Sequence, residues 1–334
     1  MEKRKKMVRI GFIGYGRFAK MRHKILSKYC TQEVEVIGYF DLNQTSDELE
    51  YFETSAKLLQ NCDAVFIAVP PGLAPMYTLE ALKNGINVFC EKPAAVCSDD
   101  LNPVQRILKQ NHRLIAAYGF NHRRHRSIIK IKELTDQQYF GRLLWMRGRY
   151  GKEVGTHYTS SWRSNKMLNG GGILIDQGIH MVDLMSWLAG GFDITSSIMS
   201  NSFFGVEKVE DNAFVTLANS ASGVSASLHS TITQWRYLFS LELFYEKGSI
   251  ILNGLRTSSG LYGDERLNIQ PNQSYENEFD TITIDYGNNH SWKDEVTSFV
   301  ESLVTSQHYP YADIHDAVAT TALIDKIYKE AKWI

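Results

Sequence analysis

An aspartate and a histidine spaced four residues apart form the clearest candidate acid–base pair of the chain. They are Asp176 and His180, in the segment GGGILIDQGIH that begins at Gly170. On a helix this spacing places both side chains on one face, where the carboxylate can orient the imidazole and stabilise its charged form. Such a pair suits general acid–base catalysis near neutral pH. A surface ion pair is the alternative, but three consecutive glycines cost helix stability and favour a place where a ligand approaches the backbone.

Lys92 is a further candidate, because it closely follows a short apolar run at 87–90. In an open parallel sheet, ligands bind beyond the carboxyl ends of the strands, so the turn Glu91-Lys92-Pro93 is expected to face that crevice. An ammonium there could donate a hydrogen bond to a substrate hydroxyl or to its developing alkoxide, and desolvation could lower its pKa. A solvated turn is the alternative interpretation.

The segment GYGRFA at 14–19 fits the GxGxxG/A pattern of dinucleotide-binding turns and lies between a strand-like and a helix-like run. Gly14 permits a tight turn, Gly16 lets backbone amides reach a pyrophosphate, and the small Ala19 lets the helix lie close to the sheet. The N-terminus of the helix then provides the anion site. The cofactor-binding residues expected from this turn and from the ends of the following strands are Gly14, Tyr15, Gly16, Arg17, Phe18, Val69, Pro70 and Glu91.

Asp41 indicates which dinucleotide is bound. It follows the second strand-like run, 22 residues after Ala19. A carboxylate there can accept hydrogen bonds from both ribose hydroxyls of the adenosine and would repel a 2′-phosphate. NAD is therefore favoured over NADP as cofactor, with NADP left open, and a simple loop role for Asp41 is the alternative.

Other polar residues are weaker candidates. The basic cluster NHRRHR begins at Asn121 and includes Arg123; it is interpreted as a solvated helix start, with contact of these two residues with substrate as the alternative. A polar, aromatic loop before the glycines could close over a polyhydroxylated ligand. Its candidate substrate-binding residues are His157, Tyr158, Trp162 and Arg163. The sequence contains neither HExxH nor a Cys/His ligand set, so no metal site is expected.

The first third of the chain has the strand and helix pattern needed to position these residues. Apolar runs near 8–14, 34–40, 64–69, 87–90 and 114–117 alternate with helical runs near 18–29, 75–83 and 101–110. Strands that are apolar throughout and separated by helices predict a doubly wound parallel sheet covered on both faces. This α/β domain is expected to span residues 1–121.

Residues 122–334 are expected to form a second, α+β domain with a largely antiparallel open sheet. The sequence alternates in the manner of antiparallel strands from about 194 to 252, and closing helices are expected at 293–304 and 315–331. The terminal helix is expected to belong to this domain or to pack back on the first one.

Composition sets the broad class. The chain has 334 residues, 43% of them hydrophobic, with 36 Lys+Arg against 37 Asp+Glu, which suits about two domains with real cores. Balanced charge argues against nucleic acid or an anionic membrane as a partner, and no apolar run reaches the ~20 residues of a membrane span. The cysteines favour free thiols in a reducing compartment, the cytoplasm. They are Cys30, Cys62, Cys90 and Cys97.

Together these motifs resemble those of the Gfo/Idh/MocA oxidoreductase family, named for glucose-fructose oxidoreductase and inositol dehydrogenase. The resemblance rests on GYGRFA, on ALKNG leading into Glu91-Lys92-Pro93, and on GGG followed by Asp176-x-x-x-His180, and it covers essentially the whole chain. It implies a Rossmann domain followed by an α/β domain whose open sheet often forms an oligomer interface. A homodimer or homotetramer through the C-terminal sheet is therefore expected.

The resemblance also implies a catalytic set, formed in the family by the EKP lysine and the second motif's aspartate and histidine: here Lys92, Asp176 and His180. The expected activity is NAD(P)-dependent hydride transfer at a secondary hydroxyl or ketone of a sugar, polyol or nucleotide-linked sugar. His180, oriented by Asp176, would remove the hydroxyl proton while Lys92 steadies the alkoxide. Two alternatives within the family stay open, an NAD-dependent glycosidase with transient oxidation and a non-catalytic sugar sensor.

Overall fold

Two structural units make up the chain. The computed structural model describes residues 7–333 except 45, 47 and 258. The first unit comprises Met1–Asn121 and Trp292–Val318, and the second comprises His122–Ser291 and Ala319–Ile334. The first unit is therefore assembled from two stretches of chain that are far apart in the sequence.

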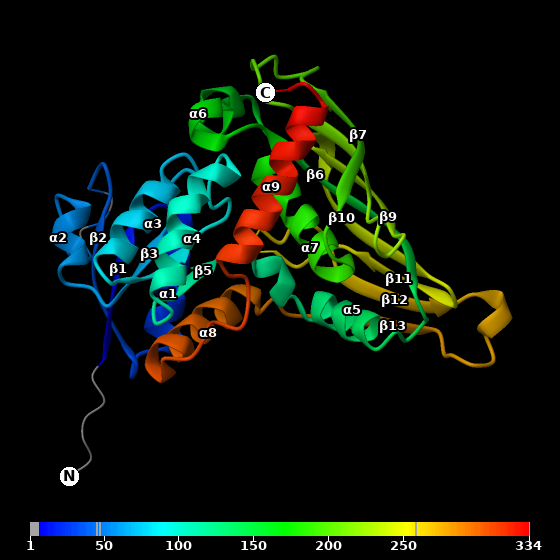
Figure 1. Ribbon diagram of the computed structural model, residues 1–334, viewed down its shortest axis with the longest axis horizontal. Helices are drawn as coiled ribbons and strands as arrows, with labels where there is room; N and C mark the ends of the chain where they lie inside the picture. Colours follow the sequence, from blue (N-terminus) through cyan, green and yellow to red (C-terminus); the bar gives the residue numbers. More distant parts are fainter. Residues whose placement is uncertain (1–6, 45, 47, 258, 334) are drawn as a thin grey trace, which may run out of the picture. The chain divides into compact units, whose positions relative to one another are not determined.

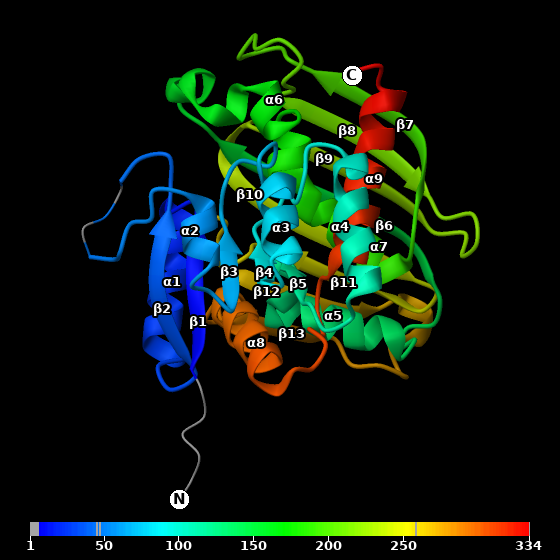
Figure 2. The same cartoon turned by 60° about the vertical axis from the view of Figure 1, so that its left-hand side comes forward.

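A five-stranded, wholly parallel sheet forms the centre of the first unit (Figures 1 and 2). In sequence order its strands are β1 (Val8–Ile13), β2 (Val34–Phe40), β3 (Ala64–Ile67), β4 (Asn87–Cys90) and β5 (Ala116–Tyr118). Their order across the sheet is β2-β1-β3-β4-β5. Every residue of β3 and β5 is buried, as expected of strands covered on both faces. The predicted doubly wound α/β sheet is confirmed.

Helices from both stretches of chain complete the first unit. They are α1 (Arg17–Tyr29), α2 (Ser55–Leu59), α3 (Ala74–Lys83), η1 (Ser98–Leu101), α4 (Asn102–Gln110) and α8 (Ser291–Thr305). The fully buried Phe299 of α8 packs edge-on against Phe66 of β3 and Phe89 of β4, with each pair of ring centroids 5.5 Å apart. The late helix α8 is thus part of the hydrophobic core of the parallel sheet.

An eight-stranded sheet dominates the second unit. Its strands are β6 (Leu143–Glu153), β7 (Asp193–Ser200), β8 (Asn212–Ala218), β9 (Ser225–Thr231), β10 (Thr233–Tyr245), β11 (Gly248–Asn253), β12 (Glu265–Pro271) and β13 (Ile282–Tyr286). Their order is β13-β12-β11-β10-β6-β9-β8-β7, and every pair is antiparallel except β6 with β9. The expected largely antiparallel sheet is confirmed.

Helices cover one face of this sheet, as Figure 1 shows for α5, α7 and the last turns of α9. The helical segments of the unit are η2 (Asn121–Arg124), α5 (Arg126–Asp136), η3 (Thr156–Ser160), η4 (Trp162–Ser164), α6 (Lys166–Asn169), η5 (Leu174–Gly178), α7 (Ile179–Ala189), η6 (Gln273–Tyr275) and α9 (Ile314–Glu330). The first residues of α9, up to Val318, belong to the first unit. Side chains alternate between the two faces of a strand, and on the other face the large apolar side chains of Trp145, Ile198 and Phe214 are exposed.

Two features bear on the broad class of the protein. Among the helices of the described residues, none is long and apolar enough to cross a membrane. All four cysteines are free thiols, as the sequence predicted, and burial raises the pKa of Cys30 to about 11 and those of Cys62 and Cys90 to about 12. These three buried thiols are therefore protonated at neutral pH.

Candidate functional site

The glycine-rich turn joins β1 to α1. Gly14 has a φ of +78°, and a Cβ added there would lie 2.5 Å from the carbonyl oxygen of Ala68, so only glycine fits. A Cβ added to Gly16 would meet no heavy atom of the described structure within 4 Å beyond its chain neighbours. Ala19 is fully buried, so α1 lies close to the sheet. The N-terminus of α1 therefore has open space beside it, which fits a pyrophosphate group.

The side chain of Asp41 is fixed to this turn. Its Oδ2 accepts a hydrogen bond from the backbone amide of Tyr15 at 2.7 Å, and its Oδ1 lies 3.4 Å from the amide of Asn43. The ring of Tyr15 is buried and stacks on Tyr39, with centroids 4.4 Å apart. The backbone amide of Tyr15, rather than its ring, therefore binds the carboxylate of Asp41, which was expected to select NAD.

Four further cofactor residues expected in the first unit are partly or fully accessible: Arg17, Phe18, Val69 and Pro70. Arg17 is exposed at the first position of α1, and Val69 and Pro70 are partly exposed just after β3. The ring of Phe18 is half-buried and stacks on Trp292, with centroids 5.6 Å apart. The side chain of Phe18 therefore contributes to packing at the start of α1.

Glu91 anchors the turn that carries Lys92. Its Oε1 accepts a hydrogen bond of 2.6 Å from Nε of Arg22 on α1, while Nη2 of the same arginine donates to Oε2 of Glu295 on α8 at 2.9 Å. Arg22 is 1% exposed, and its guanidinium lies over the ring of Phe89 at 4.1 Å. Lys92 is partly exposed, and its neighbour Glu91 is thus bound to α1, the helix that follows the glycine-rich turn.

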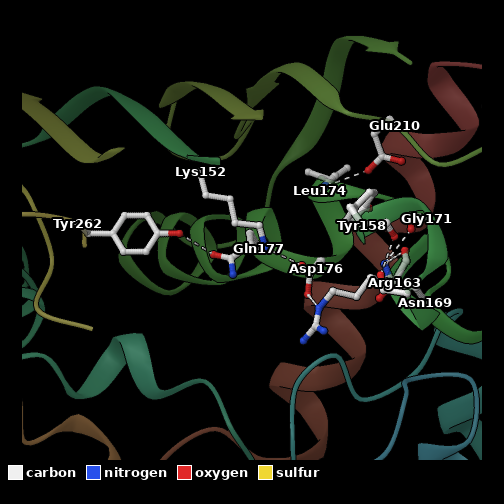
Figure 3. A network of polar contacts seen from close by, with 11 residues as sticks. Lys152, Tyr158, Arg163, Asn169, Gly171, Leu174, Asp176, Gln177, Glu210 and Tyr262 are labelled. Carbon is white, nitrogen blue, oxygen red and sulfur yellow. Dashed lines mark hydrogen bonds and ion pairs between the residues drawn. The ribbon is translucent and has the colours of Figure 1, made fainter. Parts of the chain in front are cut away.

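Asp176 lies in a π-helical turn, η5, that leads directly into α7. Its Oδ2 accepts a hydrogen bond of 3.0 Å from Nζ of Lys152 on β6, and its Oδ1 lies 3.4 Å from Nε of Arg163 in η4 (Figure 3). The carboxylate is nearly buried, at 8% side-chain exposure. Two cations thus contact this one carboxylate. Lys152 was not singled out from the sequence, because it is 24 residues from Asp176.

His180 lies in the first turn of α7 and is 4% exposed. Its ring stacks on that of His122, with centroids 3.7 Å apart and planes inclined by 13°. Nε2 of His122 and the hydroxyl of Tyr150 are 2.9 Å apart. Tyr150 also packs edge-on against Tyr262, whose hydroxyl donates a 3.3 Å hydrogen bond to the Gln177 side chain. The candidate acid–base histidine is therefore held in an ordered aromatic and polar surrounding.

The expected substrate-binding residues have different surroundings. Arg123 forms a buried two-bond ion pair with Asp183, with distances of 2.9 and 2.5 Å. Tyr158 is buried in an apolar cluster, and Asn121 is also buried. His157 is exposed, and Trp162 carries the guanidinium of Arg163 over its ring at 4.3 Å. Of this group, the structure brings Arg163 to Asp176.

The three glycines before Asp176 are approached closely by protein groups. Gly170 follows α6 with a φ of +85°. A Cβ on Gly171 would lie 2.2 Å from the hydroxyl of Tyr328, and one on Gly172 would lie 1.9 Å from the carbonyl oxygen of Glu210. The close approach that was expected of a ligand is thus made by two residues that the sequence did not indicate. Within the described ranges, no group of three or more His, Cys, Asp or Glu side chains is placed to hold a metal ion.

Two family models match the chain. One, described as an oxidoreductase family with an NAD-binding Rossmann fold, matches residues 8–119, and the other, described as the GFO/IDH/MocA C-terminal domain, matches residues 128–251. Together they match well over half of the chain.

Several curated relatives of this chain are dehydrogenases. The chain is 28% identical over 247 residues to D-glucoside 3-dehydrogenase of Escherichia coli (strain K12), covering 65% of this chain and 68% of that protein. It is 26% identical over 214 residues to glucose-6-phosphate 3-dehydrogenase of Bacillus subtilis (strain 168), covering 61% and 60%. The matched regions span about two thirds or less of these relatives.

Solved structures show the same fold. Levoglucosan dehydrogenase in complex with NADH superposes with a TM-score of 0.85 at 18% identity, covering 98% of this chain and 97% of that one. The WlbA dehydrogenase from Bordetella pertussis, in complex with NADH and UDP-GlcNAcA, gives a TM-score of 0.82 at 21% identity, with the same coverage. Given the two family models and this fold, the chain belongs to the Gfo/Idh/MocA family of oxidoreductases with an NAD-binding Rossmann domain, as its motifs predicted.

Proposed function

We propose that the protein transfers hydride between NAD and a secondary hydroxyl or ketone carbon of a sugar, polyol or nucleotide-linked sugar. One observation carries the proposal. The chain has an open glycine-rich turn with Asp41 hydrogen-bonded to it, and it also has all three residues of the family's catalytic set. The sugar class is supported by the dehydrogenase relatives.

The proposed roles of the residues follow from their chemistry. The amides at the start of α1 hold the pyrophosphate, and Asp41 receives the ribose hydroxyls. NAD, when bound, supplies the acceptor for the hydride that leaves the hydroxyl-bearing carbon. His180 takes the hydroxyl proton, Asp176 stabilises the resulting imidazolium, and Lys92 donates a hydrogen bond to the developing alkoxide. In the reverse direction the same groups protonate the reduced ketone.

The guanidinium of Arg163, beside Asp176, bears on the substrate. Arg163 uses Nε toward Asp176 and is 32% exposed, so the other edge of its guanidinium remains available to solvent or ligand. A guanidinium edge binds carboxylates and phosphates through two parallel hydrogen bonds. We therefore include an acidic substituent, as in a uronate, a sugar phosphate or a nucleotide sugar, in the proposed substrate class.

A substrate screen tests this function. NADH absorbance is followed in both directions with neutral sugars, polyols, uronates, sugar phosphates, nucleotide sugars and the corresponding keto compounds, with aryl glycosides in parallel. Net formation or consumption of NADH supports the proposal. Release of sugar from a glycoside without net NADH identifies the glycosidase alternative, and NADH binding with no turnover in any arm identifies a sensor.

Replacing Asp41 with serine should lower kcat/KM for NAD by about 10- to 100-fold, because a hydrogen bond to a charged group contributes about 1.5–3 kcal/mol. The value for NADP should change much less, because the carboxylate that repels its 2′-phosphate is removed. Initial rates with both cofactors measure this. Asp99→Ser, at an exposed position of η1, is the matched control. An unchanged ratio of NAD to NADP efficiency would contradict the role of Asp41.

The open face of the eight-stranded sheet is proposed to bind a second copy of the chain, forming a homodimer or homotetramer. Exposed Trp145, Ile198 and Phe214 add apolar area to this face, which also carries the exposed Arg147 and the partly exposed Arg149. Replacing Ile198 and Phe214 with aspartate should shift the protein toward monomer without loss of fold, as measured by light scattering during size-exclusion chromatography. The exposed Leu42, changed to aspartate, is the control. A wild-type chain that is monomeric at micromolar concentration would rule out this assembly.

A further inference from the structure

We propose that Glu210 is a positioning residue of the catalytic site. It caps the helical segment that carries Asp176 and His180, and thereby sets the position of the Asp176 carboxylate. The catalytic part of this inference rests on the proposed function. We call the arrangement of Glu210, Tyr328 and the backbone amides of residues 172–174 the Glu210 clamp. None of these groups is part of the catalytic set that the family motif implies.

The main observation is that three consecutive backbone amides bind to this one residue. The amide of Gly172 donates to Oε2 of Glu210 at 2.8 Å, and that of Leu174 donates to Oε1 at 2.9 Å. Between them, the amide of Ile173 donates to the main-chain oxygen of Glu210 at 3.1 Å. The first amides of a helix have no partner within the helix. Here a residue 38 positions further along the chain supplies one for each of them.

Tyr328 holds the carboxylate of Glu210 from its other side. Its hydroxyl donates a hydrogen bond of 2.8 Å to Oε1, and both residues are buried. The hydroxyl also lies where a Cβ of Gly171 would be, and the main-chain oxygen of Glu210 lies where a Cβ of Gly172 would be. A side chain at residue 171 or 172 would therefore clash with the Glu210 clamp, and glycine avoids this clash.

The clamp acts directly on the position of Asp176. Its three amides are followed within two residues by Asp176, whose own amide donates to the carbonyl of Gly172 at 3.1 Å. The turn η5 has π-helical geometry, which is rare and frequently found at functional sites. Asp176 must reach Lys152 at 3.0 Å and Arg163 at 3.4 Å from this turn. If the helical segment began at a different position, the Asp176 carboxylate would move away from Lys152 and Arg163.

The partners of Glu210 favour its ionised carboxylate. All three side-chain partners of Glu210 are donors: two amides and the hydroxyl of Tyr328. Burial raises the pKa of Glu210 to about 7, while these donors oppose the rise. Glutamine has the same shape but only one acceptor oxygen, so it leaves a donor without its partner.

Glu210→Gln provides the test, with Tyr328→Phe as a milder variant should the first fail to fold. Glu207→Gln, three residues earlier and exposed, is the matched control. We expect hydrogen exchange of the amides at 172–174 to become about tenfold faster or more in Glu210→Gln, with smaller acceleration in Tyr328→Phe and none in the control. With the substrate found in the screen, kcat should fall about tenfold with little change in KM, and the pH profile of kcat should shift.

The outcomes separate the clamp from the proposed function. Unchanged exchange at 172–174 in both variants overturns the clamp. Faster exchange with a wild-type kcat and pH profile overturns the positioning role and leaves a purely structural contact. A wild-type chain with no turnover overturns the proposed function and the catalytic part of this inference together, while the exchange result still decides whether the clamp exists.

Discussion

Replacing His180 with alanine is expected to lower kcat by about two orders of magnitude or more while NAD still binds, because positioned proton transfer contributes about 10²- to 10⁴-fold. The side chain removed is the proposed acceptor of the hydroxyl proton. It belongs to α7 in the second unit, whereas the expected dinucleotide residues belong to the first. Steady-state kinetics and a fluorescence titration with NADH measure the two quantities separately.

A second histidine variant is the control for a general effect of losing an imidazole. His112→Ala removes an exposed imidazole from the loop after α4 and should leave both kcat and NADH affinity unchanged. Near-normal turnover in His180→Ala would rule out the acid–base assignment. Loss of NADH binding alongside turnover would instead indicate a structural role for the stack of His180 on His122.

Replacing Arg22 with methionine is expected to destabilise the first unit by about 3–5 kcal/mol, because the change leaves two buried carboxylates without their cation. Glu91 and Glu295 bind the guanidinium at 2.6 and 2.9 Å, and the arginine is 1% exposed. Burial alone lowers the pKa of Arg22, but these two carboxylates outweigh it and the net pKa is raised. Urea unfolding measures the loss, followed by tryptophan fluorescence; one of the six tryptophans, Trp292, has its ring 4.7 Å from the guanidinium.

Two further variants show whether the effect is electrostatic. Arg106→Met makes the same change at an exposed position of α4 and should be nearly neutral. Arg22→Met combined with Glu295→Gln should recover part of the lost stability, because one uncompensated charge is removed. A double variant no more stable than the single one would assign the loss to packing against Phe89 rather than to charge.

The parts of the fold that were predictable are those encoded by neighbouring residues. Hydrophobic periodicity located the parallel strands, and GYGRFA located the turn at Gly14, where a positive φ and the nearby Ala68 carbonyl demand glycine. The spacing of Asp176 and His180 correctly placed both in one continuous helical stretch. It did not reveal that Asp176 lies in a π-helical turn, because the pattern for that geometry is not distinct from an α-helix.

What could not be predicted depends on partners that are remote in sequence. Glu210 lies 38 residues after Gly172, Lys152 lies 24 residues before Asp176, and Glu295 lies 273 residues after Arg22. Each of these contacts is made by a single polar side chain, and no periodicity in the sequence marks it. The GGG motif was visible in the sequence, but the reason for the glycines was not. The groups that lie too close for a side chain come from the loop before β8 and from α9.

The assembly of the first unit from two distant stretches has a consequence for biosynthesis. Domains generally begin to fold in order as the chain leaves the ribosome, and here the N-terminal strands emerge long before Phe299 and Glu295, which complete their core and their buried ion pairs. Until translation reaches α8, Phe66 and Phe89 lack their aromatic partner and Arg22 has only one of its two carboxylates. A nascent chain arrested at residue 121 therefore holds an unfinished nucleotide-binding unit, which is complete only after residues 292–318 have been synthesised.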